Sequence, residues 1–373
     1  MAGNIQQLNE SAVIRSLRRF RDRYFTNSGK VVKDDLTPDT GGDEAQPGLL
    51  DSLPVDVQFL IMTLLSPADI CCLGGTSRYW RAMVRDPLLW RYFLLRDMPN
   101  WPSIDHVSMP QLDLLDAPLI NEDESLDDRE EGDDRGMESK FDYMSEYLKG
   151  CPSCRQQWLP SRPAYEVVTS FLQSLVPSSE PRYAMFGPGM EQLDVSLVTR
   201  LMHAPDVLPV SSTPHRQING IGSGISYMFN HQHRFNILTL YSTNSPAPQV
   251  QQVCQVVNGF IYVANAEPGR GEGESEVAQI RAVLSSAEGS ASRPLLVLSC
   301  VSREEPEEVG ITSLPTITSR NRARCRTPCV DMAQRLGLPQ LANPWLVQDT
   351  VAESLSGLLD GISWLLRCSG VKL

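Results

Sequence analysis

The 373-residue sequence lacks any apolar run approaching the ~20 residues that a membrane-spanning helix needs. Its N-terminus lacks the apolar core of a secretory signal, so we expect a cytoplasmic or nuclear protein. Positive charge is also scarce, because 33 lysines and arginines stand against 45 aspartates and glutamates, for a formal net charge of -12. This balance argues against sequence-independent binding of nucleic-acid phosphates.

Histidine–cysteine sets of the kind that hold zinc are missing as well. The nine cysteines are odd in number and scattered, which predicts reduced thiols. Cys151 and Cys154 form a C-x-x-C, and Cys325 and Cys329 lie about 170 residues further on, with no histidine beside either pair. Because a zinc site needs four convergent ligands, buried or surface thiols are favoured over a zinc site or a redox pair. We expect no metal and no cofactor.

The chain is long enough for two or three domains. Residues 1–47 are predicted to be loosely structured, with an amphipathic helix that either self-associates or lies on the body of the protein. Residues 96–160 are predicted to be a linker that carries an acidic block at 122–135, either a flexible insertion or a docking tail for a basic partner. Between and after these stretches we expect two folded domains, at 48–95 and 161–373.

Residues 49–95 show three helix starts, each with a side-chain acceptor followed by proline: Ser52 before Pro54, Ser66 before Pro67, and Asp86 before Pro87. Apolar residues recur at helical spacing in the first helix and continue beyond it. A unit of under 50 residues is too small to bury this much apolar surface alone. The surplus indicates a binding partner, or packing against the rest of the same chain.

The spacing L-P-x-D-x-x-x-x-I-x-x-x-L-x-P-x-D, followed by C-x-L, a tryptophan and D-P-x-L-W, resembles the F-box family. The matching positions are Leu53, Pro54, Asp56, Ile61, Leu65, Pro67, Asp69, Leu73, Trp80, Asp86, Pro87, Leu89 and Trp90, with Ile70 in place of the usual leucine. The resemblance implies docking on the Skp adaptor, which joins a cullin scaffold and a RING subunit. The residues expected to dock are Leu53, Pro54, Val57, Leu60, Ile61, Leu64, Leu65, Pro67, Leu73, Trp80 and Trp90.

The remainder alternates between strand and helix patterns. We expect six strands, near 182–187, 224–230, 233–241, 258–266, 294–300 and 343–350, with the second and third as a hairpin. Helices are expected over 193–204, 276–287 and 351–368. The fold class is therefore multidomain: all-α F-box helices followed by an α/β three-layer domain. The order of its elements resembles the small-GTPase fold.

A phosphate loop, however, needs G-x-x-x-x-G-K-S/T. Counting from Gly187, Gln192 replaces the second glycine, Leu193 replaces the lysine and Asp194 replaces the hydroxyl. The segments 241–244 and 299–302 likewise lack the D-x-x-G and N-K-x-D patterns. The turn through Gly187 and Gly189 is then strand-to-helix geometry, and we expect neither nucleotide binding nor hydrolysis.

An F-box followed by such a domain resembles one group of F-box substrate receptors, through the phrases DPLLWRYFLLRD, AMFGPG, GFIYVANAE, RPLLVLSC and PWLVQDT. This resemblance implies a non-catalytic ubiquitin-ligase adaptor, with a telomere-repeat-binding factor and D-type cyclins as substrates and self-association near the N-terminus. The alternatives are an active GTP-binding protein and an F-box scaffold outside any ligase.

Substrate binding is expected at an unpaired sheet edge, because such an edge can add a strand from another protein. In the small-GTPase order this edge is the strand formed by Ser226, Tyr227, Met228, Phe229 and Asn230. The alternative is that a loop of the same chain covers it.

Overall fold

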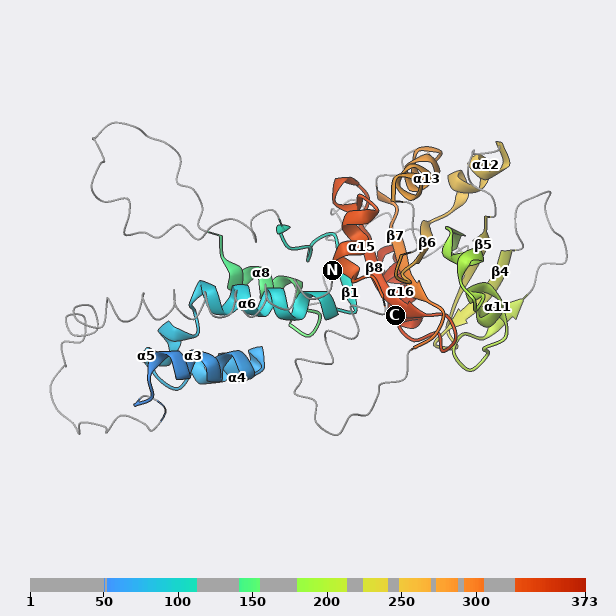
Figure 1. The fold of residues 1–373 in the computed structure, drawn as a ribbon. Coiled ribbons are helices and arrows are strands. Elements are labelled where there is room, and N and C mark those ends of the chain that lie inside the picture. The colour runs from blue at the N-terminus through green and yellow to red at the C-terminus, as the bar shows by residue number, and fades with distance from the viewer. Residues whose placement is uncertain are drawn as a thin grey trace, which may run out of the picture. The chain divides into compact units, whose positions relative to one another are not determined.

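The computed structural model describes residues 50, 52–112, 141–154, 180–212, 224–240, 248–269, 273–287, 292–304 and 326–373. The chain divides into two compact units, a helical unit from residues 1–97 and 110–148 and a sheet unit from residues 98–109 and 149–373. Figure 1 shows the elements of each. The predictions for the N-terminal helix, the acidic block and the segment 241–244 lie outside the described residues.

The helical unit contains α3 (Val55–Leu64), α4 (Pro67–Gly74), α5 (Arg78–Met83), α6 (Pro87–Asp97) and most of α8 (Tyr143–Gly150). Two predicted helix starts are confirmed. Ser66 Oγ accepts a hydrogen bond from the Asp69 backbone N–H at 3.2 Å, and its hydroxyl donates to the Asp69 carboxylate at 2.6 Å. Asp86 Oδ1 accepts from the backbone N–H of Leu88 at 2.8 Å. These caps satisfy amides that have no partner within the helix.

The start of α3 differs from the prediction that Ser52 precedes it as the cap. Pro54 stands at the N-cap position, without a side-chain hydrogen bond. Instead, the buried Gln58 amide donates to the backbone oxygens of Leu50 and Leu53, at 3.0 and 3.1 Å. A side chain one turn into the helix therefore fixes the entering chain, which capping patterns do not reveal.

An aromatic cluster forms the core of the helical unit. Trp90 is fully buried, and its ring centroid lies 5.6 Å from that of Phe93 and 5.4 Å from that of Tyr147. The Trp90 indole N–H donates to the backbone oxygen of Val84 at 2.6 Å, and the Tyr147 hydroxyl donates to Asp97 at 2.8 Å. Since Tyr147 lies on α8, part of the predicted linker at 96–160 belongs to this core.

Replacing Trp90 with phenylalanine is expected to destabilise the helical unit by about 1–3 kcal/mol, because it leaves the Val84 oxygen unpaired and a void beside Phe93. Urea denaturation of the full chain measures the change. Trp364→Phe, at a partly buried position on α16, is the matched control and should cost less. An unchanged urea midpoint for Trp90→Phe would contradict the assignment of Trp90 to the core.

The sheet unit contains eight described strands: β1 (Ser103–Asp105), β2 (Arg182–Phe186), β3 (Val210–Ser212), β4 (Gly224–Phe229), β5 (His233–Thr239), β6 (Gly259–Asn265), β7 (Leu295–Val301) and β8 (Trp345–Val351). Their order in the sheet is β1-β8-β7-β6-β2-β5-β4-β3. The strands from β8 to β5 are parallel, whereas β1, β4 and β3 each pair antiparallel with a neighbour. The six predicted strands and the β4–β5 hairpin are confirmed.

Helices α11 (Leu197–Met202) and α16 (Leu358–Cys368) share one apolar core with alternate residues of the strands, such as Ile261, Leu296 and Leu298. The other face is buried as well, because every residue of β6, β7 and β8 is buried. Helices α12 (Pro248–Val256), α13 (Gly273–Ser285) and α15 (Cys329–Arg335) lie in this unit (Figure 1). Short helices at α10 (Gly189–Gln192), η1 (Met98–Asn100) and η4 (Leu338–Gln340) complete it.

Two predicted helices have different bounds in the structure. The helix predicted over 193–204 is shorter in the structure, because only α11 (Leu197–Met202) falls in this range, and residues 193–196 separate it from α10. The C-terminal helix predicted over 351–368 begins only at Leu358, because β8 extends to Val351 and two residues then adopt left-handed backbone, Leu355 at φ 58° and Gly357 at φ 76°. A Cβ at residue 357 would lie 2.0 Å from the Asp349 oxygen, so glycine is required there.

Candidate functional site

The outer face of α3 carries an apolar strip formed by Val57, Leu60 and Leu64. Their side chains are 39%, 48% and 63% exposed, and their spacing places them on one side of the helix. The opposite side of α3 presents Phe59 and Met62, which are 1% and 0% exposed. The helix is thus apolar on two sides, one packed into the unit and one facing outward, and the outward side is suited to burial against a partner helix.

The remaining predicted docking residues divide into two groups. Pro54 is exposed beside the strip, and five others are partly exposed: Leu53, Ile61, Leu65, Pro67 and Leu73. Trp80 and Trp90, in contrast, are 5% and 0% exposed and lie in the core of the helical unit. The expectation that Trp80 and Trp90 dock beside the leucines is therefore corrected, because the two rings are buried within the helical unit. Trp80 and Trp90 therefore occupy F-box motif positions because they stabilise the fold, and not because they form a binding surface.

The predicted substrate edge is also corrected by the structure. Strand β4 is not an edge, because β3 pairs with it at Val210–Tyr227 and Ser212–Ser226, and the Met228 N–H donates to the Pro209 oxygen at 2.9 Å. Tyr227 and Phe229 are buried, at 1% and 6% exposure. Asn230 is exposed at the hairpin turn with φ 49°, together with His231 at φ 56°. Because β3 occupies this side of β4 at Ser226, Tyr227 and Met228, a strand from another protein cannot pair with β4 there.

The glycine turn after β2 lies directly against β6. Gly187 has φ 124°, and a Cβ there would lie 2.5 Å from the Val263 oxygen. A Cβ at Gly189 would lie 2.9 Å from a Val263 methyl carbon. The two glycines are therefore explained by the close approach of two strands of the sheet. Helix α10, which follows, is only four residues long.

Beyond that turn, hydrogen bonds close the carboxyl end of the sheet. The Asp194 N–H donates to Ser302 Oγ at 3.0 Å, and the Ser302 hydroxyl donates to the Glu267 carboxylate at 2.5 Å. Leu193 is buried, whereas Gln192 and Asp194 are exposed. Parallel sheets bind ligands in the crevice where the strand order reverses, here between β2 and β6. Around this crevice, the Ser302 and Glu267 side chains connect the loops of the protein through hydrogen bonds.

A buried polar cluster occupies the ends of β7 and β8. The Arg326 Nη2 atom lies 2.8 Å from Asp349 Oδ1 and donates to the Ser299 oxygen at 2.6 Å, and the Cys329 thiol donates to Asp349 Oδ1 at 3.0 Å. The Arg326 and Asp349 side chains are only 9% and 8% exposed. Burial raises the pKa of the nearby Cys300 thiol to about 12, so Cys300 is a neutral thiol and not a nucleophile. The sequence prediction missed this cluster, although the polar residues Gln348, Asp349 and Thr350 at the end of a predicted strand were a signal.

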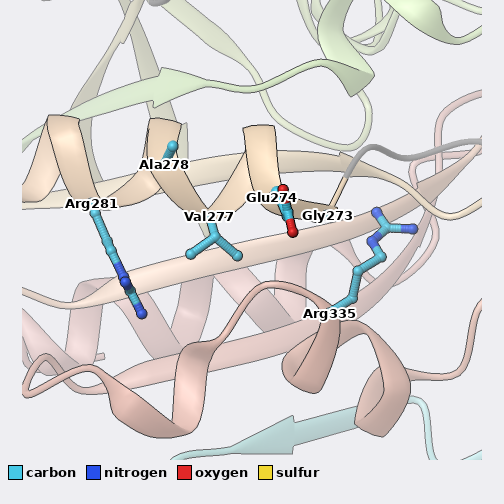
Figure 2. A pocket seen from close by; sticks show the side chains of 6 residues that line it. All are labelled: Gly273, Glu274, Val277, Ala278, Arg281 and Arg335. Atoms are coloured by element: carbon cyan, nitrogen blue, oxygen red, sulfur yellow. The ribbon is translucent and has the colours of Figure 1, made fainter.

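A second ion pair lies at the end of β6. Arg335 Nε is 3.2 Å from the buried Glu276 carboxylate, and Arg335 Nη2 donates to the Asn265 oxygen at 3.0 Å. Beside it is an open groove of about 560 Å³ lined by α13 and Arg335, with Val277 and Ala278 between Glu274, Arg281 and Arg335 (Figure 2). Arg281 donates to Gln340 at 2.7 Å. Because these positive and negative side chains balance, the groove offers no strong field for a charged ligand.

Within the described residues, no group of three or more histidine, cysteine or acidic side chains could hold a metal ion. Among the described helices, none is long and apolar enough to cross a membrane.

Comparison with known proteins connects these features. The F-box-like family matches residues 50–96, which contain the apolar strip of α3 and the Trp90 and Phe93 rings of the aromatic core. The chain is 42% identical to F-box only protein 4 of Mus musculus over 90% of this chain and 89% of that protein. It is 42% identical to the Bos taurus protein of the same name, over 90% and 88%, and 43% identical to the Homo sapiens protein, over 85% and 83%. Identity of this extent covers both units, and the chain therefore belongs to the F-box only protein 4 family.

Proposed function

We propose that the chain is the substrate-recognition subunit of a ubiquitin ligase built from the Skp adaptor, a cullin scaffold and a RING subunit. The observation that carries this proposal is the outward strip of Val57, Leu60 and Leu64 on an F-box whose own core is already complete. Burying such side chains contributes about 1.5–3 kcal/mol each, enough for a small helical interface. The catalytic chemistry then belongs to the conjugating enzyme, and this chain positions the target protein.

We propose further that the sheet unit is a small-GTPase-like domain that binds protein rather than nucleotide. The strand order β4-β5-β2-β6-β7-β8, with β4 antiparallel, is similar to that of small GTPases. Asp194, Ser302 and Glu267 are hydrogen-bonded to one another at the crevice where a nucleotide would lie, and Glu191 adds a further exposed carboxylate. A carboxylate 4 Å from a phosphate costs about 1–4 kcal/mol, so the site disfavours phosphates.

A nucleotide titration tests this part of the proposal. The full chain, titrated with a fluorescent GTP analogue in the presence of Mg²⁺, is expected to show no saturable change in fluorescence up to about millimolar nucleotide, which corresponds to less than about 4 kcal/mol of binding free energy. Micromolar binding that unlabelled GTP competes away would instead support a GTP-binding protein.

As substrates we propose a telomere-repeat-binding factor and D-type cyclins, met in the cytoplasm or the nucleus, with a homodimer of this chain as the form that binds them. This step rests on the family membership and not on any described surface. A reconstituted ligase with each candidate substrate tests it, and ubiquitin chains should appear only when this chain is present. If the chain binds the Skp adaptor but neither candidate is ubiquitinated, the proposed place in the ligase would stand, and these two proteins would be excluded as its substrates. Adaptor binding without assembly onto the cullin would favour a scaffold outside any ligase.

A further inference from the structure

A Cys-Pro-Ser-Cys turn follows α8 directly. The backbone N–H of Cys154 donates to the Cys151 oxygen at 3.0 Å, which closes a four-residue β-turn with Pro152 in its second position. Proline is favoured at that position because its fixed φ matches the turn. The first and last Cα atoms of such a turn lie within about 7 Å of each other, close to the ~4.4–6.8 Å that a disulfide spans. The backbone therefore already holds the two cysteines at disulfide spacing.

The side chains in this turn gather at one serine. Ser153 Oγ lies 3.2 Å from the Cys151 sulfur and 4.0 Å from the Cys154 sulfur. Both sulfurs therefore lie near the same hydroxyl, on a turn whose backbone spacing allows a disulfide. Neither cysteine is in a disulfide, and Cys151 is buried at 6% exposure whereas Cys154 is exposed. A pair with one accessible and one sheltered thiol suits stepwise oxidation, in which the exposed sulfur reacts first.

The alternative role for a C-x-x-C, half of a metal site, finds no support among the residues that the structure places. No third ligand joins the pair in that part of the chain. The exposed neighbours Cys71 and Cys72 offer a useful contrast, because consecutive residues of the regular helix α4 point in different directions and cannot approach without unwinding it.

We propose that Cys151 and Cys154 form a reversible dithiol–disulfide pair that responds to hydrogen peroxide. The Cys154 thiolate attacks one peroxide oxygen, the O–O bond breaks, and the departing hydroxide takes up a proton, which leaves a sulfenic acid and one water. The Cys151 sulfur then attacks the Cys154 sulfur and displaces the hydroxyl as a second water. The two sulfurs lose two electrons and two protons in total, and an external dithiol returns them. This proposal is independent of the proposed ligase function.

Trypsin provides a direct measurement, because Lys149 and Arg155 bracket both cysteines in the peptide GCPSCR. The full folded chain is treated with hydrogen peroxide, then alkylated, digested and analysed by mass spectrometry without reductant. The peptide is expected two hydrogens lighter and unalkylated, with the fraction in this form raised at least about tenfold over the untreated protein. Dithiothreitol before alkylation should restore the doubly alkylated peptide.

Cys71 and Cys72, in the tryptic peptide 34–78, serve as the control in the same sample and should remain alkylated. A Cys154→Ser variant should leave Cys151 unable to form any internal disulfide. The proposal is overturned if peroxide converts Cys154 only to sulfinic acid or to a disulfide between two chains. It is equally overturned if GCPSCR stays doubly alkylated after peroxide, whether or not the 34–78 peptide oxidises.

Discussion

Replacing Leu60 and Leu64 together with aspartate is expected to weaken binding of the Skp adaptor by about 1,000-fold. Both side chains lie on the outward strip of α3, at 48% and 63% exposure, and each is expected to act as an interface hot spot worth about 2 kcal/mol or more. Because about half of each side chain is already exposed in the folded chain, its own stability should fall by about 1 kcal/mol at most. Calorimetric titration of the full chain with purified adaptor measures the affinity, and thermal unfolding measures the stability.

Val256→Asp is the matched control for this pair. Val256 ends α12 in the sheet unit and is 58% exposed, so the change introduces an aspartate at a comparably exposed apolar residue, with one added charge against two. Adaptor affinity should stay within a factor of about two of the wild type, less than 0.5 kcal/mol. If the double variant bound the adaptor as tightly as the control, the strip of α3 would not be the docking surface. If it unfolded, the single change Leu64→Ser would repeat the test.

Removing the Arg326 side chain is expected to have the largest effect on stability, about 3–5 kcal/mol for Arg326→Ala. The substitution leaves the Asp349 carboxylate, 8% exposed, without its cation 2.8 Å away, and an unpaired buried charge is strongly destabilising. It also removes the donor to the Ser299 oxygen. A fall in Tm of about 6–20 °C should appear in thermal unfolding of the full chain.

Arg303→Ala separates burial from pairing. Arg303 is also paired with a carboxylate, Glu353 at 3.6 Å, but the two side chains are 69% and 53% exposed. Exposed ion pairs contribute about 0–1 kcal/mol, so this variant should unfold close to the wild type. Arg326→Met combined with Asp349→Leu should recover much of the loss, since apolar replacements of a buried pair are often neutral. Equal effects at Arg326 and Arg303 would show that the Arg326 cluster contributes nothing through its burial.

Much of the helical unit could be predicted from the sequence, because its determinants are local. Ser66 with Asp69, and Asp86 with Leu88, interact over two or three residues, and the pattern of such pairs is visible in the sequence. The strands β6 and β7 could also be recognised from the sequence, because a strand that is buried on both faces appears as a continuous apolar run. The start of α3 was missed because Gln58 bonds backwards to Leu50, over eight residues, in a way that no cap motif describes.

The candidate site was only partly predictable for the same reason. Helical spacing identified Val57, Leu60 and Leu64 as apolar, and the F-box resemblance then placed Trp90 among the docking residues beside them, although it is fully buried. Periodicity shows that residues are apolar and does not show which of two apolar sides a neighbouring helix covers. The prediction that β4 is an edge strand was wrong because β3 pairs with it. β3 is only three residues long, which is too short to be recognised as a strand in the sequence.

By itself, the sequence determined the F-box helices, the order of the main strands and the absence of a phosphate-binding lysine after Gly187. The tertiary structure alone decided that Trp80 and Trp90 are internal, that β1 extends the sheet beside β8, and that Arg326 is buried against Asp349. The physical reason is distance along the chain. Caps and apolar runs act between neighbours, whereas β1 pairs Ile104 with Val347, and burial depends on every segment that folds over a side chain.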